Sequence, residues 1–162
     1  MTIRKTKYDD LASVMEIYQA ARTFMKQAGN PTQWKTNHPP KAQIEKDISM
    51  GKSYVCENND GILAVFFFDT NPDSTYAKID GAWLNDSPYG VVHRIARNYN
   101  LTSAKGVGAF CINQCFKEVG NIRIDTHENN APMIKMLETL GFVRCGIIWL
   151  ENGEERIAFQ KC

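Results

Sequence analysis

The stretch SAKGVGAFCINQCF, Ser103–Phe116, places two glycines directly in front of a segment with helical spacing. Apolar residues recur every three or four positions from Val107 to Val119, which predicts a helix there. Because glycine has no Cβ atom, Gly106 and Gly108 let another group come close to the first amides of this helix. Those amides lack intrahelical partners and are suited to binding phosphate. Alternatively, the two glycines only allow a tight turn and close packing.

Two common nucleotide-binding motifs do not match this stretch. In a dinucleotide-binding fingerprint the third glycine or alanine would fall at Cys111, and no βαβ unit opens the chain. In a Walker motif a Lys-Ser/Thr pair follows the glycines, whereas Lys105 precedes them here. The phosphate hypothesis therefore depends on the elements around the stretch.

In residues 1–69 the sequence predicts two helices and three strands. The first helix is predicted to begin after a capping Asp9 or Asp10 and to end near Gln27, because its apolar residues form one stripe. The other elements are a strand over 2–7, a helix over 41–50, and strands over 53–57 and 62–69 joined by the turn at 58–61.

Nearer to the glycines, residues 70–89 are predicted to form an ordered loop, and Gly90–Arg97 a strand that leads to them. The remaining elements are a strand over 121–126, a helix over 130–140 and two strands joined by a turn at 152–153. This order predicts an α/β (α+β) fold, a single domain over 1–162 with a mixed central sheet flanked by helices.

Length and composition bound the possible functions. A chain of 162 residues with 43% hydrophobic content is large enough for one core. Its 19 basic and 18 acidic residues favour neither nucleic acid nor an anionic membrane as partner. No apolar run has the length of a signal peptide or a membrane span, so we expect a cytoplasmic protein. Five cysteines without a CxxC pair predict free, mostly buried thiols and no metal site.

Two segments in this order resemble the acetyl-CoA motifs of the GCN5-related N-acetyltransferase (GNAT) family. The first is HRIAR, His93–Arg97, followed by SAKGVGAFCINQCF. The second is IDTHENNAPMIKMLETLGF, Ile124–Phe142, in which an Asn opens a helix that ends in Leu-Gly-Phe. The resemblance implies a splayed strand pair that holds acetyl-CoA, and direct attack of a primary amine on its thioester. The amine would belong to a small molecule or a protein, and a homodimer is possible.

The resemblance also implies which residues bind the cofactor. Backbone groups of one strand would pair with the pantetheine arm, amides of the glycine stretch would hold the pyrophosphate, and an Asn would lie beside the thioester. These residues are, in order along the chain, Ile95, Ala96, Arg97, Ser103, Ala104, Lys105, Gly106, Val107, Gly108, Ala109 and Asn130. The sequence departs from the family pattern at Ser103, usually Arg or Gln, and at Leu137, where many members have the Tyr that protonates the leaving thiolate.

The catalytic residues are predicted to be Asp125 and His127. Asp125 matches a position that is acidic in several family members and serves there as a base. In a strand both side chains project from one side, so a carboxylate would lie beside an imidazole. The alternative is that Asp125 acts as a cap or forms an ion pair with Arg123 or Arg97, and that His127 is only a turn residue. His93 is a further titratable residue, but alternation from Arg94 assigns it a structural role.

Three aromatic residues in irregular segments are predicted to line the acceptor side. They are Trp34, Tyr76 and Trp83. Each could instead simply cover the core. A second function also stays open, since Ser103 and Leu137 are compatible with a non-catalytic acyl-CoA-binding or sensor module of the same fold.

Overall fold

The computed structural model describes all residues from 1 to 162. By its contacts the chain groups into two compact units, the first made of Met1–Phe68 and Arg94–Cys111, the second of Asp69–His93 and Ile112–Cys162. None of its helices combines the length and apolar composition needed to cross a membrane.

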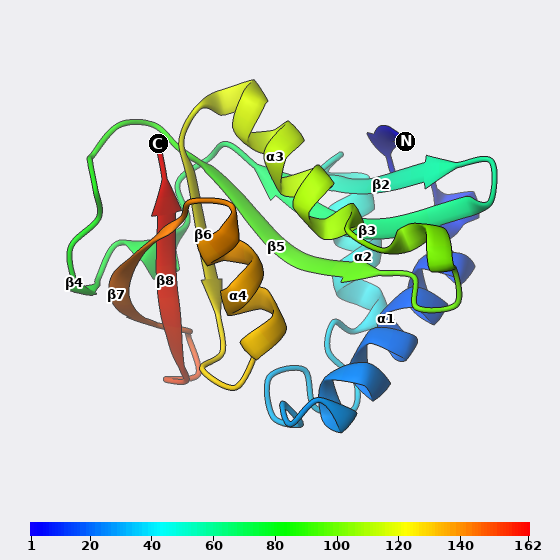
Figure 1. The fold of residues 1–162 in the computed structure, drawn as a ribbon, viewed down its shortest axis with the longest axis horizontal. Helices are drawn as coiled ribbons and strands as arrows, with labels where there is room; N and C mark the ends of the chain where they lie inside the picture. The colour runs from blue at the N-terminus through cyan, green and yellow to red at the C-terminus, as the bar shows by residue number, and fades with distance from the viewer. The chain divides into compact units, whose positions relative to one another are not determined.

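The first unit contains the N-terminal helices and strands. Strand β2 pairs antiparallel with β1 on one side and with β3 on the other, and Figure 1 shows the long β2–β3 hairpin. These elements confirm the predicted ones to within a few residues. Their bounds are β1 Thr2–Lys5, η1 Tyr8–Asp10 (a 3₁₀ turn), α1 Leu11–Gln27, α2 Lys41–Ser49, β2 Ser53–Asn58 and β3 Gly61–Asp69.

The prediction that an aspartate side chain caps the start of α1 is wrong. Asp10 stands at the N-cap position, but its side chain makes no capping hydrogen bond. Its carboxylate instead accepts from the Lys7 amide at 2.8 Å and from the Arg4 guanidinium at 2.7 Å. The Arg4 hydrogen bond holds the pKa of Asp10 below its usual range. Asp10 therefore joins β1 to the turn before the helix.

The second unit contains the C-terminal elements. Strand β8 lies between β6 and β7 and is antiparallel to both (Figure 1). The predicted loop over 70–89 is partly wrong, since it includes a 3₁₀ turn and a short strand that pairs with β7. The bounds are η2 Ser74–Tyr76, β4 Asp80–Gly81, β6 Ile122–Thr126, α4 Ala131–Thr139, β7 Val143–Trp149 and β8 Glu155–Lys161.

Strand β5, Gly90–Arg97, and helix α3, Val107–Val119, have the predicted bounds, and the 3₁₀ turn η3, Thr102–Ala104, lies between them. Strand β5 pairs parallel with β6 through Gly90 and Val91 alone, whereas the other recorded pairings are antiparallel. The hydrogen-bonded strand order is β1-β2-β3-β5-β6-β8-β7-β4. The predicted mixed sheet is confirmed. The short β5–β6 pairing leaves the rest of β5 unpaired with β6.

A close backbone approach joins β4 to β7 and requires glycine on both strands. Gly146 has φ +147, and a Cβ atom there would collide with the Asp80 carbonyl oxygen. We therefore expect Gly146→Ala to lower the free energy of unfolding by about 3 kcal/mol or more, through backbone displacement and loss of the β4 pairing. The control is Gly153→Ala, at φ +83 with open space around it. Equal losses in urea unfolding of the two variants would contradict this interpretation.

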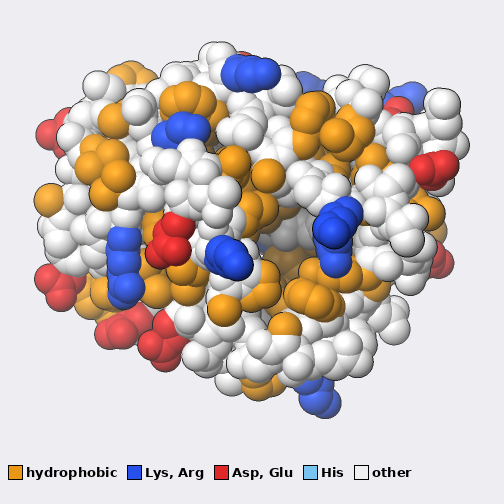
Figure 2. Space-filling view, viewed as in Figure 1, with side chains coloured by type: hydrophobic (Ala, Val, Ile, Leu, Met, Phe, Trp, Pro, Cys, Tyr) orange, Lys and Arg blue, Asp and Glu red, His pale blue; other side chains and the backbone are white.

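Charged side chains are mixed over the surface in view. On the face drawn in Figure 2, basic and acidic side chains alternate with hydrophobic ones and form no continuous field of one sign. This distribution agrees with the formal net charge of +1.

Candidate functional site

The start of α3 presents four consecutive backbone amides to a ligand. The amides of Gly106, Val107, Gly108 and Ala109 donate to no acceptor of the chain, while the amide of Phe110 donates to the Gly106 carbonyl at 3.2 Å. Such amides, with the positive end of the helix dipole, favour a bound anion. We call residues 106–109 the amide row.

The glycine conformation at the head of this row fits a phosphate-bearing group. Gly106 has φ +81, and a Cβ atom built there would meet nothing within 4 Å. Other residues rarely adopt this φ, so Gly106 is needed for the turn into the helix. Gly108 lies within α3 and has no positive φ. The open space and the unpaired amides are compatible with the pyrophosphate of acetyl-CoA.

The other residues predicted to bind the cofactor lie in two further segments. Ile95 and Arg97 are half-buried in β5, and Ala96 between them is buried. Ser103 and Lys105 are exposed and Ala104 is buried in the turn before the amide row. Asn130 is the N-cap of α4, and its side chain accepts from the Met133 amide at 3.3 Å.

A carboxylate–imidazole–carboxylate cluster lies in the second unit. His93 Nε2 is 2.7 Å from Asp73 Oδ2, and His93 Nδ1 is 3.6 Å from Asp125 Oδ1. The Tyr76 hydroxyl donates to the same Asp125 oxygen at 2.7 Å. Asp125 thus contacts His93 and Tyr76. It does not form the alternative ion pair with Arg123 or Arg97. We call these four residues the Asp-His cluster.

The surroundings of the cluster set its charges. Burial raises the pKa of Asp73, but hydrogen bonds from His93 and Thr75 outweigh it and hold that pKa well below the usual range. Burial and the Asp125 charge raise the pKa of Tyr76 well above its usual value. Asp73 is therefore an anion and Tyr76 a neutral donor near neutral pH. The arrangement can hold a proton on an imidazole between two carboxylates.

His127 lies in the turn after β6. Its Nδ1 atom accepts from the Asn129 amide at 3.1 Å, and its carbonyl accepts from the Asn130 amide at 2.9 Å. Burial, and secondarily the charge of Arg156, lower the pKa of His127. The imidazole next to Asp125 is therefore that of His93, and His127 supports the start of α4.

The three aromatic residues predicted to line the acceptor side have different environments. Trp34 is only 7% exposed and packs in the apolar core of the first unit, against Tyr18. Tyr76 is buried as part of the Asp-His cluster. Trp83 is half-buried, and its indole N–H donates to the Tyr76 carbonyl at 3.0 Å. Trp34 is thus a core residue, while the other two support the cluster.

Acid titration tests the anionic state of Asp73. A carboxyl whose pKa is lowered by folding adds stability above its unfolded pKa near 3.9 and loses it as the pH falls further. We expect Asp73→Asn to be about 2 kcal/mol less stable than the wild type at pH 7, and the difference to shrink below pH 4. Urea unfolding from pH 7 to pH 3 measures this. Asp86→Asn, at an exposed loop position, is the control, and parallel curves for wild type and Asp73→Asn would contradict the assignment.

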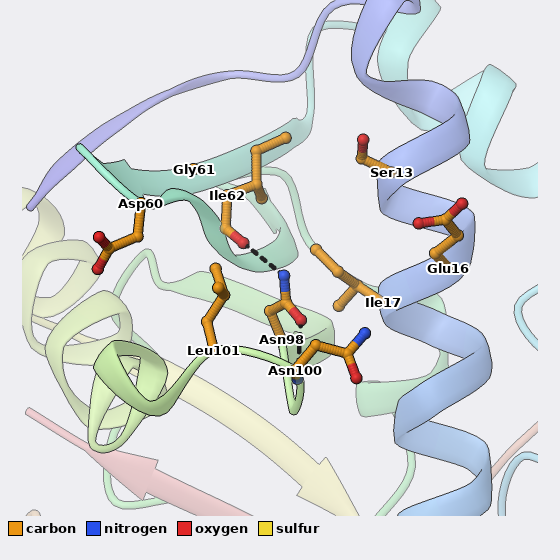
Figure 3. Close-up of a pocket in the computed structure, with 9 residues that line it drawn as sticks. All are labelled: Ser13, Glu16, Ile17, Asp60, Gly61, Ile62, Asn98, Asn100 and Leu101. Atoms are coloured by element: carbon orange, nitrogen blue, oxygen red, sulfur yellow. Dashed lines mark hydrogen bonds between the residues drawn. The ribbon is translucent and has the colours of Figure 1, made fainter.

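A separate pocket of about 280 Å³ lies in the first unit, between α1, the β2–β3 turn and the segment after β5 (Figure 3). The Asn98 side chain stands in its wall and donates to the Ile62 carbonyl at 3.0 Å. Its lining includes the carboxylates of Glu16 and Asp60 and no cationic side chain. A phosphate-bearing molecule is therefore better matched to the amide row than to this pocket.

Sequence reasoning did not identify Asp73 and did not place His93 beside Asp125. Asp73 belongs to the turn signal Asn71-Pro72-Asp73, which marks a loop but no chemistry. In β5 the side chain of His93 shares a face with that of Val91, and Val91 is paired with Arg123 of β6. Because Asp125 lies on the same face of β6 as Arg123, this register brings the His93 imidazole beside the Asp125 carboxylate. Both residues come to Asp125 from segments distant in the sequence, so no local pattern reveals the cluster.

Comparison with known proteins gives matches of structure and none of sequence. No family model matches this sequence, and neither does a curated protein. Many solved structures are similar to the chain. A GNAT-family acetyltransferase from Streptococcus agalactiae 2603 is 26% identical, with a TM-score of 0.88 over 99% of this chain and 94% of that one.

Two more distant structures share the fold over the whole chain. A GNAT-family acetyltransferase from Listeria monocytogenes 4b F2365 is 20% identical, with a TM-score of 0.72 over 99% of this chain and 93% of that one. A phosphinothricin acetyltransferase from Sinorhizobium meliloti, in complex with AcCoA, is 15% identical, with a TM-score of 0.66 over 99% of this chain and 86% of that one. The mixed sheet, the amide row and these similarities agree, and the chain has the GCN5-related N-acetyltransferase fold.

Proposed function

We propose that this protein is an N-acetyltransferase that uses acetyl-CoA and acts on a primary amine of a small molecule or a protein. The observation that carries the proposal is the amide row, the four unpaired backbone amides of residues 106–109 at the start of α3. The similarity to the Streptococcus agalactiae acetyltransferase along nearly the whole chain supports it. The AcCoA complex of the Sinorhizobium meliloti enzyme supports the choice of donor.

The chain's own groups have distinct roles in binding the donor. Amides 106–109 bind the pyrophosphate, and Ser103, Ala104 and Lys105 form the turn that leads into them. Backbone groups of Ile95–Arg97 bind the pantetheine arm, since this part of β5 is unpaired with β6. Asn130 contributes indirectly, because its side chain caps the first turn of α4. Acetyl-CoA supplies a thioester that an amine can attack directly, so no cysteine nucleophile is needed.

The Asp-His cluster supplies the base. An alkyl amine is protonated near neutral pH and must lose a proton before it can attack. Asp125 accepts that proton and passes it to His93 Nδ1, and the Asp73 carboxylate on the other ring nitrogen stabilises the imidazolium that forms. In this proposal His93 replaces His127 as the imidazole partner, because it is His93 that lies 3.6 Å from Asp125. The residues Tyr76 and Trp83 orient Asp125 and cover the cluster.

One observation favours a second function, a non-catalytic acyl-CoA sensor. Leu137, at the position where many family members have a Tyr, is fully buried and has no proton to donate. In the catalytic proposal solvent protonates the leaving thiolate. In the sensor proposal no transfer occurs and acyl-CoA binding alone is the function.

The experiment combines binding and turnover. Acetyl-CoA at saturating concentration is expected to raise the melting temperature, and ATP and NAD are not. Release of free CoA is then followed with a panel of primary amines and N-terminal or lysine-containing peptides. Turnover with any acceptor supports the enzyme, and stabilisation without turnover over the whole panel favours the sensor. Absence of stabilisation by acetyl-CoA would contradict both.

A further inference from the structure

We propose that Asp47 and Tyr18 are positioning residues that hold Arg94 in a left-handed backbone conformation and so set the course of β5 over Ile95–Arg97. This inference rests on the proposed function, in which backbone groups of Ile95–Arg97 bind the pantetheine arm. All six residues lie in the first unit, and the contacts that hold Arg94 are made within that unit.

Arg94 has a backbone conformation that its residue type disfavours. Its φ is +50 in the middle of β5, and only one other non-glycine residue, Lys35 in a loop, has a positive φ. Such a residue persists where surrounding contacts over-determine it. In a strand it interrupts alternation and turns the next residues, as a bulge does.

The side chain of Arg94 is held by a buried carboxylate. Its Nε and Nη2 atoms lie 3.0 Å and 2.9 Å from Asp47 Oδ2, and Asp47 is only 1% exposed. Gln43 donates to the other Asp47 oxygen at 2.8 Å, so the carboxylate is held from both sides. The guanidinium also lies over the Phe67 ring, 4.5 Å from its centroid. The position of the Arg94 side chain is therefore determined by α2 and β3.

The backbone of Arg94 is held from α1. The Tyr18 hydroxyl donates to the Arg94 carbonyl at 2.9 Å, and Tyr18 is fully buried against Trp34. The Arg94 carbonyl thus accepts a hydrogen bond from the Tyr18 side chain, whereas in a regular strand it would accept one from a backbone amide of the neighbouring strand. With both the side chain and the carbonyl fixed, the peptide after Arg94 has one orientation, and the hydrogen-bonding groups of Ile95–Arg97 follow from it.

A buried ion pair is poor support for stability but can select one conformation. Removing Asp47 leaves the Arg94 charge without its partner, so Arg94 can return to an ordinary strand conformation. The Ile95–Arg97 segment then turns, and its amides no longer face a pantetheine arm. The residues Asp47 and Tyr18 act through Arg94 and need not touch the donor.

The test is the affinity for CoA, measured by calorimetry, of variants chosen to separate conformation from charge. Glycine adopts positive φ without strain, so Arg94→Gly is expected to keep CoA affinity within about threefold of wild type, whereas Arg94→Ala lowers it about tenfold. Asp47→Asn and Tyr18→Phe are each expected to lower it about three- to tenfold. Arg4→Ala, which removes another Arg–Asp pair of the same unit, is the control and leaves affinity unchanged.

Equal losses in Arg94→Gly and Arg94→Ala, with wild-type affinity in Asp47→Asn, would overturn the proposal and indicate a direct role of the Arg94 charge. A melting curve for each variant ensures that only folded protein is compared. An NMR measurement of the intraresidue HN–Hα contact of residue 94 reports positive φ independently of any ligand. If wild type bound no CoA, the proposed function would fail, while loss of this NMR signature in Asp47→Asn would still support the clamp and its persistence would refute it.

Discussion

Gly106→Val is expected to weaken CoA binding on the order of a hundredfold while the protein stays folded. A β-branched residue cannot hold φ +81 without strain, so the turn into α3 must change and the amide row loses its alignment. The new side chain also fills the open space in front of the amides. The dissociation constant for CoA, by calorimetry, and the melting temperature measure the two effects separately.

The matched control is Gly153→Val. Gly153 has nearly the same φ, +83, and is equally open, but it lies in the turn between β7 and β8. This variant bears the same backbone strain without changing the amide row, so its CoA affinity should equal that of wild type. If both variants lost affinity equally, general destabilisation would explain the result. Unchanged affinity in Gly106→Val would refute the pyrophosphate role of the row.

Asp125→Asn is expected to lower kcat about 10²- to 10³-fold and to leave the dissociation constant for acetyl-CoA unchanged. The amide has nearly the shape of the carboxylate and can still accept the Tyr76 hydrogen bond, but it cannot take a proton from the amine. The measurement is the steady-state rate with an acceptor that gives turnover in the amine panel, at several pH values, together with calorimetric binding of the donor.

Glu128→Gln is the control for this variant. Glu128 is an exposed acid three residues further along the chain, and its loss removes the same charge without touching the cluster. Wild-type kcat is expected for it. A pH–rate profile of Asp125→Asn that matched wild type would remove Asp125 from the base role, and a parallel loss of donor affinity would assign it to binding instead.

Most of the secondary structure follows from local patterns in the sequence. The apolar stripe of α1, the two-sided apolar run of β3 and the Gly141 stop after α4 lie where periodicity and turn chemistry place them. The segment 70–89 was predicted less well, because β4 exists only through its pairing with β7. A strand of two residues has no periodicity of its own to detect.

The amide row and the Asp-His cluster differ in how far their residues are separated in the sequence. The amide row depends on one turn and the start of one helix, both local, so the glycines at 106 and 108 mark where it lies. The phosphate role predicted for it depends on the motifs on either side. The Asp-His cluster joins Asp73, His93 and Asp125, which are 20 to 52 residues apart in the chain. The pairing of Val91 with Arg123 puts His93 on the face of Asp125, and this register between two separate strands has no local sequence signal.

Local chemistry thus establishes the elements, the mixed-sheet class and the glycine turn at the start of α3, because propensity, periodicity and the lack of a Cβ atom act over a few neighbouring residues. Folding decides the partner of Asp125, the burial of Trp34 and the conformation of Arg94, because these depend on contacts between distant segments. The carboxylate of Asp47 and the hydroxyl of Tyr18 have no sequence signature that marks them for residue 94. They acquire that role only when α1 and α2 pack beside β5.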